Sequence, residues 1–395
     1  MDTKVSSTST DRRGFLKIAG MGAGTLALAG AGGLTWRAVD GGVFATGTGP
    51  AYAAWDALRP SGQGPLGLVR AAVLAANAHN TQPWHFRVAT DRIDLFADTS
   101  RDIGTMDPLG REMQISLGCA IENLALAGPP HGRTCRVRLL PDPADPTHIA
   151  RVDLTASRQP PSALFAAIPH RHTNRGAYDR TRPVSSGRLD ALGALIDAPD
   201  VDLVWLTQAA EKRRFGDLTT RATAKIIADP QQAADDFAWY RTDWDEIQAK
   251  KDGITIDPSG QSALIRSLAK VLPVSQKQNN DGWLKGTRET QIPTAAAFGV
   301  LVVRDALDPL QRLQVGRSWQ RLQLSATTHG LGVQPLCQVL ERIDREHSAG
   351  LPADFSTAMA AMLPSGWHPA MTFRIGYPTM EALRSPRRPA TDVVA

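Results

Sequence analysis

The sequence has few cysteines, and their arrangement argues against two common ways of stabilising a fold. Cys119, Cys135 and Cys337 are the only three in 395 residues. An odd number at such wide spacing is not the pattern of a disulfide framework, nor does it supply the paired ligands of a structural zinc site. We therefore expect these cysteines to be small, buried apolar residues.

Long runs of like charge and the signatures of catalysis are scarce as well. The formal charge is +5, but the positive residues are scattered until the stretch from Arg384 to Arg388. A basic chain without a basic patch does not indicate a nucleic-acid partner. His170 and His172 have no third ligand at useful spacing, so no metal site is expected. No Ser-His-Asp, Cys-His or paired-carboxylate arrangement assigns a catalytic residue.

The N-terminus carries a pattern of its own. Asp11 to Lys17 read D-R-R-G-F-L-K, an uncharged stretch runs from Ile18 to Trp36, and Ala51-Tyr52-Ala53 is a small-x-small cleavage site. This resembles a twin-arginine (Tat) signal peptide. We predict that residues 1–53 are read by the Tat translocase, and that the protein is exported to the periplasm or another extracytoplasmic location. An uncleaved membrane anchor is the alternative.

The rest of the chain has ordinary globular composition, 42% hydrophobic and 21% charged. Its patterns predict two similar halves, 54–158 and 159–395, in an α+β fold with mixed, mainly antiparallel sheets flanked by helices. Helices are expected at 64–79, 115–127, 164–168, 186–196, 218–228, 230–239 and 310–329, and strands at 86–88, 93–96, 135–140, 149–154, 201–206, 297–303 and 371–375. The mostly polar residues 240–290, with one short helix expected at 263–272, are interpreted as a lid.

Two amides stand at a corner of the first half. Asn80 and Gln82 follow the end of the first helix, and Pro83 turns the chain. Amide side chains offer donors and acceptors together, which suits the edge of a heteroaromatic ring such as a flavin. The alternative is a turn whose amides satisfy their own backbone, and spacing alone favours that alternative.

A second group of polar residues could bind an anion. Arg171-His-Thr-Asn-Arg175 places two guanidiniums and a hydroxyl in one loop, and such groups can converge on a phosphate. The alternative is a solvated basic loop. The tail around Arg387 is either a frayed terminus or a segment that returns to the same phosphate.

Taken together, these motifs resemble the nitroreductase family. Asn80-Thr-Gln-Pro-Trp84 looks like its N-x-Q-P-W element, and Arg171 to Arg175 looks like its R-x-S/T-x-R phosphate motif. Gly330-Leu-Gly332, Ile375 to Pro378 and Arg387 to Pro389 look like the C-terminal half of the family. Because the N-x-Q-P-W element precedes the arginine motif here, the better match is the Acg-like subfamily, which has two nitroreductase-like halves in one chain.

The resemblance implies a tandem pseudo-dimer that is monomeric and holds one FMN. The first half would place Asn80 and Gln82 against the flavin ring, with a helix containing Met113, Gln114, Ser116 and Gly118 nearby. The second half would bind the phosphate through Arg171, Thr173, Arg175 and Arg387. Asn77 stands where the family often has Ser.

Two functions are compatible with this resemblance. The first is an oxidoreductase that passes hydride or electrons from a reduced donor such as NAD(P)H to a small acceptor. The flavin would carry out the redox chemistry. The second is an exported flavin-binding or flavin-sequestering protein with little turnover, in which residues 240–290 cover the flavin with Trp239, Trp244 or Trp283 over the ring.

Overall fold

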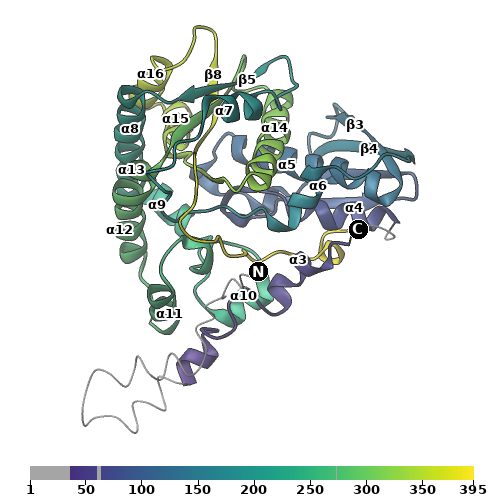
Figure 1. The fold of residues 1–395 in the computed structure, drawn as a ribbon, viewed down its shortest axis with the longest axis horizontal. Helices are drawn as coiled ribbons and strands as arrows, with labels where there is room; N and C mark the ends of the chain where they lie inside the picture. Colours follow the sequence, from purple (N-terminus) through teal and green to yellow (C-terminus); the bar gives the residue numbers. More distant parts are fainter. Residues whose placement is uncertain (1–35, 60–63, 273) are drawn as a thin grey trace, which may run out of the picture.

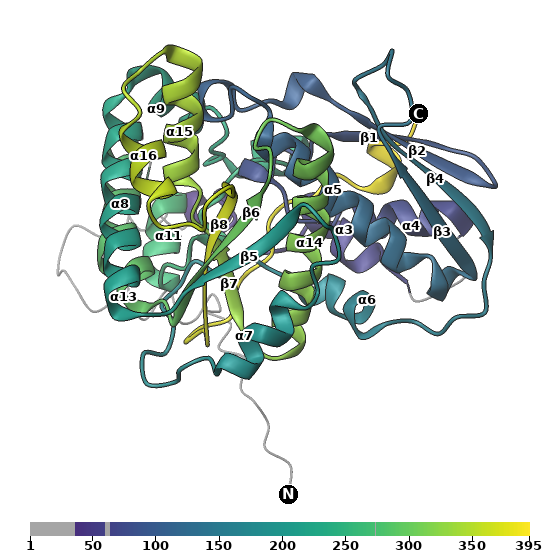
Figure 2. The ribbon, with the colours of Figure 1, turned by 90° about the horizontal axis from the view of Figure 1, so that it is seen from above.

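The structure, a computed structural model, describes residues 36–59, 64–272 and 274–395. This part of the chain contains two four-stranded sheets, in which all strand pairs are antiparallel, surrounded by helices (Figures 1 and 2). The predicted α+β class is therefore confirmed. The arginine pair of the predicted signal lies outside the described residues. Within them, no helix combines the length and apolar character needed to span a membrane.

The first sheet and the second have the same construction. In the first, α5 (Arg111–Ala127) connects the second strand to the third, and the strand order is β1-β2-β4-β3. In the second, α14 (Pro309–Thr328) makes the same connection, and the order is β5-β6-β8-β7. This repeat is consistent with the predicted pair of halves. The strands are β1 (Trp84–Val88), β2 (Arg92–Ala97), β3 (Arg133–Leu139), β4 (His148–Ala156), β5 (Val201–Leu206), β6 (Ala297–Val303), β7 (Gly332–Pro335) and β8 (His368–Gly376).

Hydrophobic pattern explains where the strands lie. Every residue of β6, A-F-G-V-L-V-V, is buried, as expected for a central strand that is covered on both faces. Strand β3 instead alternates between half-buried and exposed residues, because it is an edge strand with one face toward water.

The remaining helices surround these sheets, and several differ from the expectations. Residues 240–290 contain three helices instead of one, each started by a side chain that caps its first turn: Asp243, Ser262 and Ser275. The first expected helix ends at Ala72. The helices are α3 (Ala53–Ala57), α4 (Gly64–Ala72), α6 (Ala163–Ala167), α7 (Ser186–Gly193), α8 (Ala209–Ala228), α9 (Pro230–Phe237), α10 (Trp244–Lys250), α11 (Ala263–Val271), α12 (Gln276–Gly286), α13 (Ile292–Thr294), α15 (Gln338–Ala349) and α16 (Asp354–Ala360).

Helices α5 and α14 lie between the two sheets and touch backbone to backbone (Figure 2). A Cβ placed on Gly118 would lie 2.2 Å from the carbonyl oxygen of Leu313, and one on Gly316 would lie 2.1 Å from that of Ile115. Cys119, the one fully buried cysteine, donates to the carbonyl of Gly316 at 3.2 Å. The close crossing therefore depends on two glycines, one from each half.

Replacing Gly316 by alanine should lower the free energy of unfolding by about 2 kcal/mol or more, because neither backbone can yield without separating the helices. The measurement is the midpoint of urea unfolding. Gly187→Ala in α7 is the matched control, since a Cβ there meets nothing within 4 Å, and it should be neutral or slightly stabilising. Equal midpoints for the two variants would contradict the close crossing.

The C-terminal tail crosses from the second sheet to the first (Figure 1). Its end pairs with β1, where Phe86 donates its N–H to the Val393 carbonyl at 2.7 Å and accepts from the Ala395 N–H at 2.9 Å. On the way, Arg387 donates its N–H to the carbonyl of Ala51 at 2.7 Å. The tail is therefore an ordered part of the fold, and it carries Arg387 into the interior.

Candidate functional site

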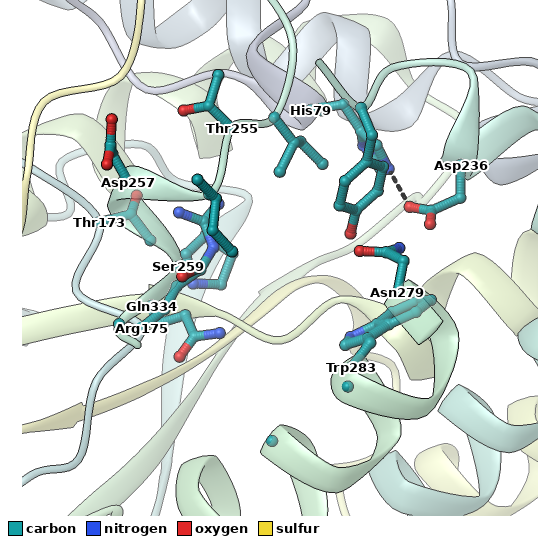
Figure 3. A pocket seen from close by; sticks show the side chains of 18 of the residues that line it. His79, Thr173, Arg175, Asp236, Thr255, Asp257, Ser259, Asn279, Trp283 and Gln334 are labelled. Carbon is teal, nitrogen blue, oxygen red and sulfur yellow. Dashed lines mark hydrogen bonds and ion pairs between the residues drawn. The ribbon is translucent and has the colours of Figure 1, made fainter. Parts of the chain in front are cut away.

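Two adjoining cavities lie where the halves meet. The larger has a volume of about 700 Å³ and the smaller about 40 Å³. Five residues line both cavities: Ala76, Asn77, Thr173, Arg175 and Ile254. Asn77 lies just before the N-x-Q-P-W element, and Thr173 and Arg175 belong to the arginine motif. The two motifs therefore lie next to each other although they are far apart in the chain. Figure 3 shows the larger cavity, with Thr173 and Arg175 on one side and His79 and Asp236 on the other.

Three guanidiniums surround the smaller cavity. Arg171 and Arg387 are 3% and 4% exposed, and Arg175 is partly buried. Their partners are neutral oxygens: Arg171 donates to Gln323 Oε1 at 2.8 Å, Arg175 to the Pro258 carbonyl at 3.4 Å, and Arg387 to Asn80 Oδ1. Among the described residues, none of the three forms an ion pair with a carboxylate.

This concentration of buried positive charge is unstable without an anion. The Nε atoms of Arg171 and Arg387 are buried and have no hydrogen-bond partner. Burial lowers the pKa of Arg171 to about 10, and burial together with the charge of Arg171 lowers the pKa of Arg387 well below its usual value. A buried charge without a counter-charge is costly. The residues present therefore fit a bound phosphate, which would pair with all three guanidiniums.

Other residues that line the smaller cavity are also compatible with a bound phosphate. The ring of His172 lies edge-on to Trp55, with centroids 4.6 Å apart. Burial and the nearby charges of Arg171, Arg387, Arg384 and His170 lower the pKa of His172 to about 2, so its imidazole is neutral. Thr173 lies at the junction of the two cavities, where its hydroxyl can reach a ligand that extends from one into the other.

The backbone of the first motif is strained. His79, Asn80 and Gln82 have φ of 47°, 56° and 53°, in the left-handed region that non-glycine residues seldom adopt. Strained residues persist where the surrounding structure fixes them, and they cluster at functional sites. Asn77 holds this loop by accepting the N–H of Gln82 at 2.9 Å and donating to the Ala75 carbonyl at 3.1 Å.

The two amides lie differently from the arrangement that the resemblance implies. Asn80 lines the smaller cavity, where its Oδ1 accepts from Arg387 and its Nδ2 donates to the carbonyls of Gly253 and Pro386. Gln82 lines neither cavity; it donates to the Lys251 carbonyl at 2.8 Å and accepts from the N–H of Arg388 at 2.7 Å. The amides thus fasten lid and tail to the loop, because carbonyls on both segments lie within reach.

The helix predicted to lie near the flavin does line the larger cavity, but through a different face. Met113 and Gln114 are absent from the lining, and Gln114 accepts from Arg312 Nη1 at 3.3 Å. The residues of α5 that line the cavity are Arg111, Glu112, Ile115, Ser116 and Cys119. The reason is helical periodicity: positions 112, 115, 116 and 119 share one face, and 113 and 114 point away from it.

The far end of the larger cavity is acidic. Glu112, Asp236 and Glu341 line it and are at most 9% exposed. Burial and then the charge of Glu112 raise the pKa of Glu341 well above its usual value, which favours the uncharged form of this carboxyl. His79 lies among these groups, with its Nε2 2.8 Å from Asp236 Oδ1. The cavity is thus positive at one end and holds a buried His–Asp pair at the other.

Residues 240–290, interpreted above as a lid, contribute part of the lining of the larger cavity. Trp244 and Trp283 line it, whereas Trp239 is held elsewhere, with its indole N–H donating to the Asp102 carbonyl at 3.0 Å. Further lid residues in the lining come from the loop and helices between them: Thr255, Asp257, Ser259, Ile265, Lys270 and Asn279. A ligand in this cavity would be enclosed by the lid.

Comparisons with known proteins bear on this site. No family model matches the chain. The chain is 28% identical to "Putative NAD(P)H nitroreductase Rv3131" of Mycobacterium tuberculosis over 332 residues, which covers 82% of this chain and 88% of that protein. It is 32% identical to "Putative NAD(P)H nitroreductase acg" of the same organism over 87 residues, covering 22% and 26%. The resemblance to nitroreductases is therefore supported over most of the chain.

Solved structures give a weaker comparison. A nitroreductase with bound FMN from Desulfitobacterium hafniense is 14% identical and covers 59% of this chain and 97% of its own, with a TM-score of 0.35. One with bound FMN from Bacteroides fragilis is 12% identical and covers 57% and 94%, with a TM-score of 0.34. These values establish no shared fold by themselves. Among the described residues, no group of three or more His, Cys, Asp or Glu could hold a metal ion.

Several residues of the site were missed from the sequence. Asp236, Tyr240, Glu341 and Trp319 line the larger cavity but belong to no motif, and they lie far from the motifs in sequence. His79 is different, because it directly precedes Asn80 of the N-x-Q-P-W element. A titratable residue next to a motif amide was a signal that could have identified it.

Proposed function

We propose that this protein is an FMN-binding, nitroreductase-like oxidoreductase that passes hydride or electrons from a reduced donor to a small acceptor. The observation that carries this proposal is a set of three guanidiniums around a small cavity that adjoins a much larger one; within the described part of the chain, none of the three forms an ion pair with a carboxylate. A phosphate in the smaller cavity would pair with the guanidiniums, and a ring system would occupy the larger cavity. When bound, the flavin would supply the hydride chemistry.

In this arrangement each part of the chain has a defined task. Arg171, Arg175 and Arg387 hold the phosphate, and Thr173 holds the linker between phosphate and ring. Asn80 positions Arg387 through its Oδ1. The lid helices α10 to α12 exclude water from the larger cavity, which strengthens the electrostatic interactions inside it.

The first experiment is simple. Purified protein should be yellow and should release FMN on denaturation; a colourless protein that cannot take up FMN would refute the proposal. Anaerobic mixing with NADPH then measures the donor reaction. Rapid bleaching followed by recovery on adding a quinone or nitroaromatic supports turnover.

A second function is favoured by the lid. Because helices α10 to α12 enclose the larger cavity, the protein could hold FMN with little turnover. Colour that persists in NADPH, together with flavin that stays bound through gel filtration, would support sequestration instead of catalysis.

We also infer that the chain is exported by the Tat route and retains residues 36–53. The predicted cleavage site supports retention, because Ala51 and Tyr52 are 0% and 1% exposed in the fold and a protease requires an accessible segment. N-terminal sequencing of the exported protein tests this: a new N-terminus at residue 54 would refute retention. Sedimentation tests the expected monomer.

A further inference from the structure

The buried pair of His79 and Asp236 is not used by the proposed phosphate site. Both line the larger cavity, at the end away from Arg175 (Figure 3). His79 Nε2 lies 2.8 Å from Asp236 Oδ1, and the two side chains are 10% and 5% exposed. Burying an ion pair costs desolvation free energy, so a functional role for this pair is a reasonable hypothesis.

We propose that His79, held by Asp236, donates the proton to an acceptor that is reduced through a doubly bonded oxygen, as in a quinone or a nitro group. This inference rests on the proposed oxidoreductase function and extends it to the group that supplies the proton. Within the described residues, Nε2 of His79 has a hydrogen-bond partner, whereas Nδ1 has none. Nδ1 is therefore the atom that can reach a substrate.

Geometry fixes the orientation of the imidazole. His79 lines the cavity from a backbone with a positive φ of 47°, and Asp236 at the end of α9 holds the ring by Nε2. A carboxylate that accepts from one ring nitrogen sets the tautomer and orientation of the other. Among the described residues, the second oxygen of Asp236, Oδ2, is buried without a hydrogen-bond partner, so the carboxyl is held to His79 through Oδ1.

The surroundings of His79 raise its pKa. Burial lowers that pKa, but the hydrogen bond and charge of Asp236 and the charge of Glu112 outweigh burial and the opposing charge of Arg175. The other titratable groups near this pair are Tyr240 and Glu341, whose pKa burial raises, and Arg111, which pairs with Glu112. The imidazolium therefore persists to higher pH than that of an ordinary histidine, and it is lost as the pH rises through the raised pKa.

Hydrogen-bond donors lie at this end of the cavity. Arg111 also lines the cavity and donates to Glu112 Oε1 at 3.3 Å, so the charge of Glu112 has a partner. An acceptor oxygen of the substrate would accept from the imidazole of His79.

The proton balance is simple. A quinone takes up one hydride and one proton to become a hydroquinone; a nitro group takes up the same pair and loses water to become a nitroso group. In both, the hydride comes from the proposed flavin chemistry and the proton from His79, which then regains a proton from solvent. Loss of such a donor typically costs about 100-fold or more in rate.

The test compares His79→Gln and Asp236→Asn with the unchanged full-length protein, with His368→Gln at an exposed position as the control. All four should bind FMN. Turnover of a quinone and of a nitroaromatic should fall about 100-fold in His79→Gln, while reduction of ferricyanide, which takes up no proton, should be unchanged. In Asp236→Asn the alkaline limb of the pH profile should move to lower pH.

A readout independent of turnover completes the test. In flavin-free protein, NMR titration should give His79 a pKa above that of an ordinary histidine, and Asp236→Asn should lower it. Equal loss of quinone and ferricyanide reduction, or a His79 that titrates normally in both proteins, would overturn the inference. Absence of bound flavin in the unchanged protein would instead refute the proposed function.

Discussion

Replacing Arg171 by methionine should weaken FMN binding and, in flavin-free protein, raise the thermal stability. The guanidinium is 3% exposed and has no carboxylate partner among the residues that the structure describes. Lowering its pKa from 12.5 to about 10 corresponds to a penalty of about 3 kcal/mol in the folded state. Because the folded state binds the proton more weakly, this penalty is fully present below pH 10 and declines above it.

Methionine removes the penalty and keeps the apolar stem. It loses the hydrogen bonds to Gln323 and to the Leu74 carbonyl, each worth about 1 kcal/mol net. The melting temperature of flavin-free protein should rise by roughly 2 °C. In protein with bound phosphate the effect on stability reverses, because the substitution removes a charge-assisted contact worth about 2 kcal/mol. For the same reason, FMN affinity should fall about 30-fold.

The prediction is specific because stability should rise while FMN affinity falls. Calorimetry of flavin-free protein measures the stability, and fluorescence titration with FMN measures the affinity. Arg136→Met on β3, an exposed arginine, should change neither. A variant that loses both stability and affinity would mean that Arg171 is a structural residue whose neighbours already compensate its charge.

The arginine cluster proposed to bind phosphate was predictable because one short motif contains its chemistry. Arg171, Thr173 and Arg175 are close in sequence, and only the arrival of Arg387 depends on the fold. The tail reaches them because its end pairs with β1, a contact between residues more than 300 positions apart that no local pattern reports.

The acidic end of the cavity was not predictable for the same reason. Asp236 lies 157 positions from His79, and Glu341 lies on α15, a helix that was not anticipated. The positions of Asn80 and Gln82 relative to the cavities depend on the fold, because amides near a ligand can equally bind the carbonyls of a lid. Within residues 240–290 the helix expected at 263–272 is present as α11, whereas α10 and α12 were not anticipated, and capping by Asp243 and Ser275 was their available signal.

Residues 41–52, which we call the strap, fasten the lid. Lys270 of α11 donates to the Gly42 carbonyl at 3.3 Å and to Thr46 Oγ1 at 3.0 Å. Gln248 of α10 accepts from the Ala51 N–H at 3.0 Å and donates to the Thr48 carbonyl at 3.2 Å. These four hydrogen bonds join the lid to a segment that the predicted signal-peptide cleavage would remove.

A chain that begins at residue 54 should therefore have an open lid. Four hydrogen bonds at about 1 kcal/mol each, and the stacking of Tyr52 on Trp244, are lost together. Amide hydrogen exchange in α10 and α11 should rise at least about 10-fold, and bound FMN should become accessible to iodide quenching. A chain that begins at residue 36 keeps the strap and is the matched control.

Point substitutions separate the strap's contacts from its contribution to folding. Lys270→Met removes two of the four hydrogen bonds and the ion pair with Asp257, whose atoms lie 2.8 Å apart, without shortening the chain. It should increase exchange in α11 more than in α14, which makes none of these contacts. If exchange in α11 is the same in all of these proteins, the strap does not hold the lid. If the predicted increase is observed, removal of residues 1–53 during export would open the cavity, and retention of the strap would keep it closed.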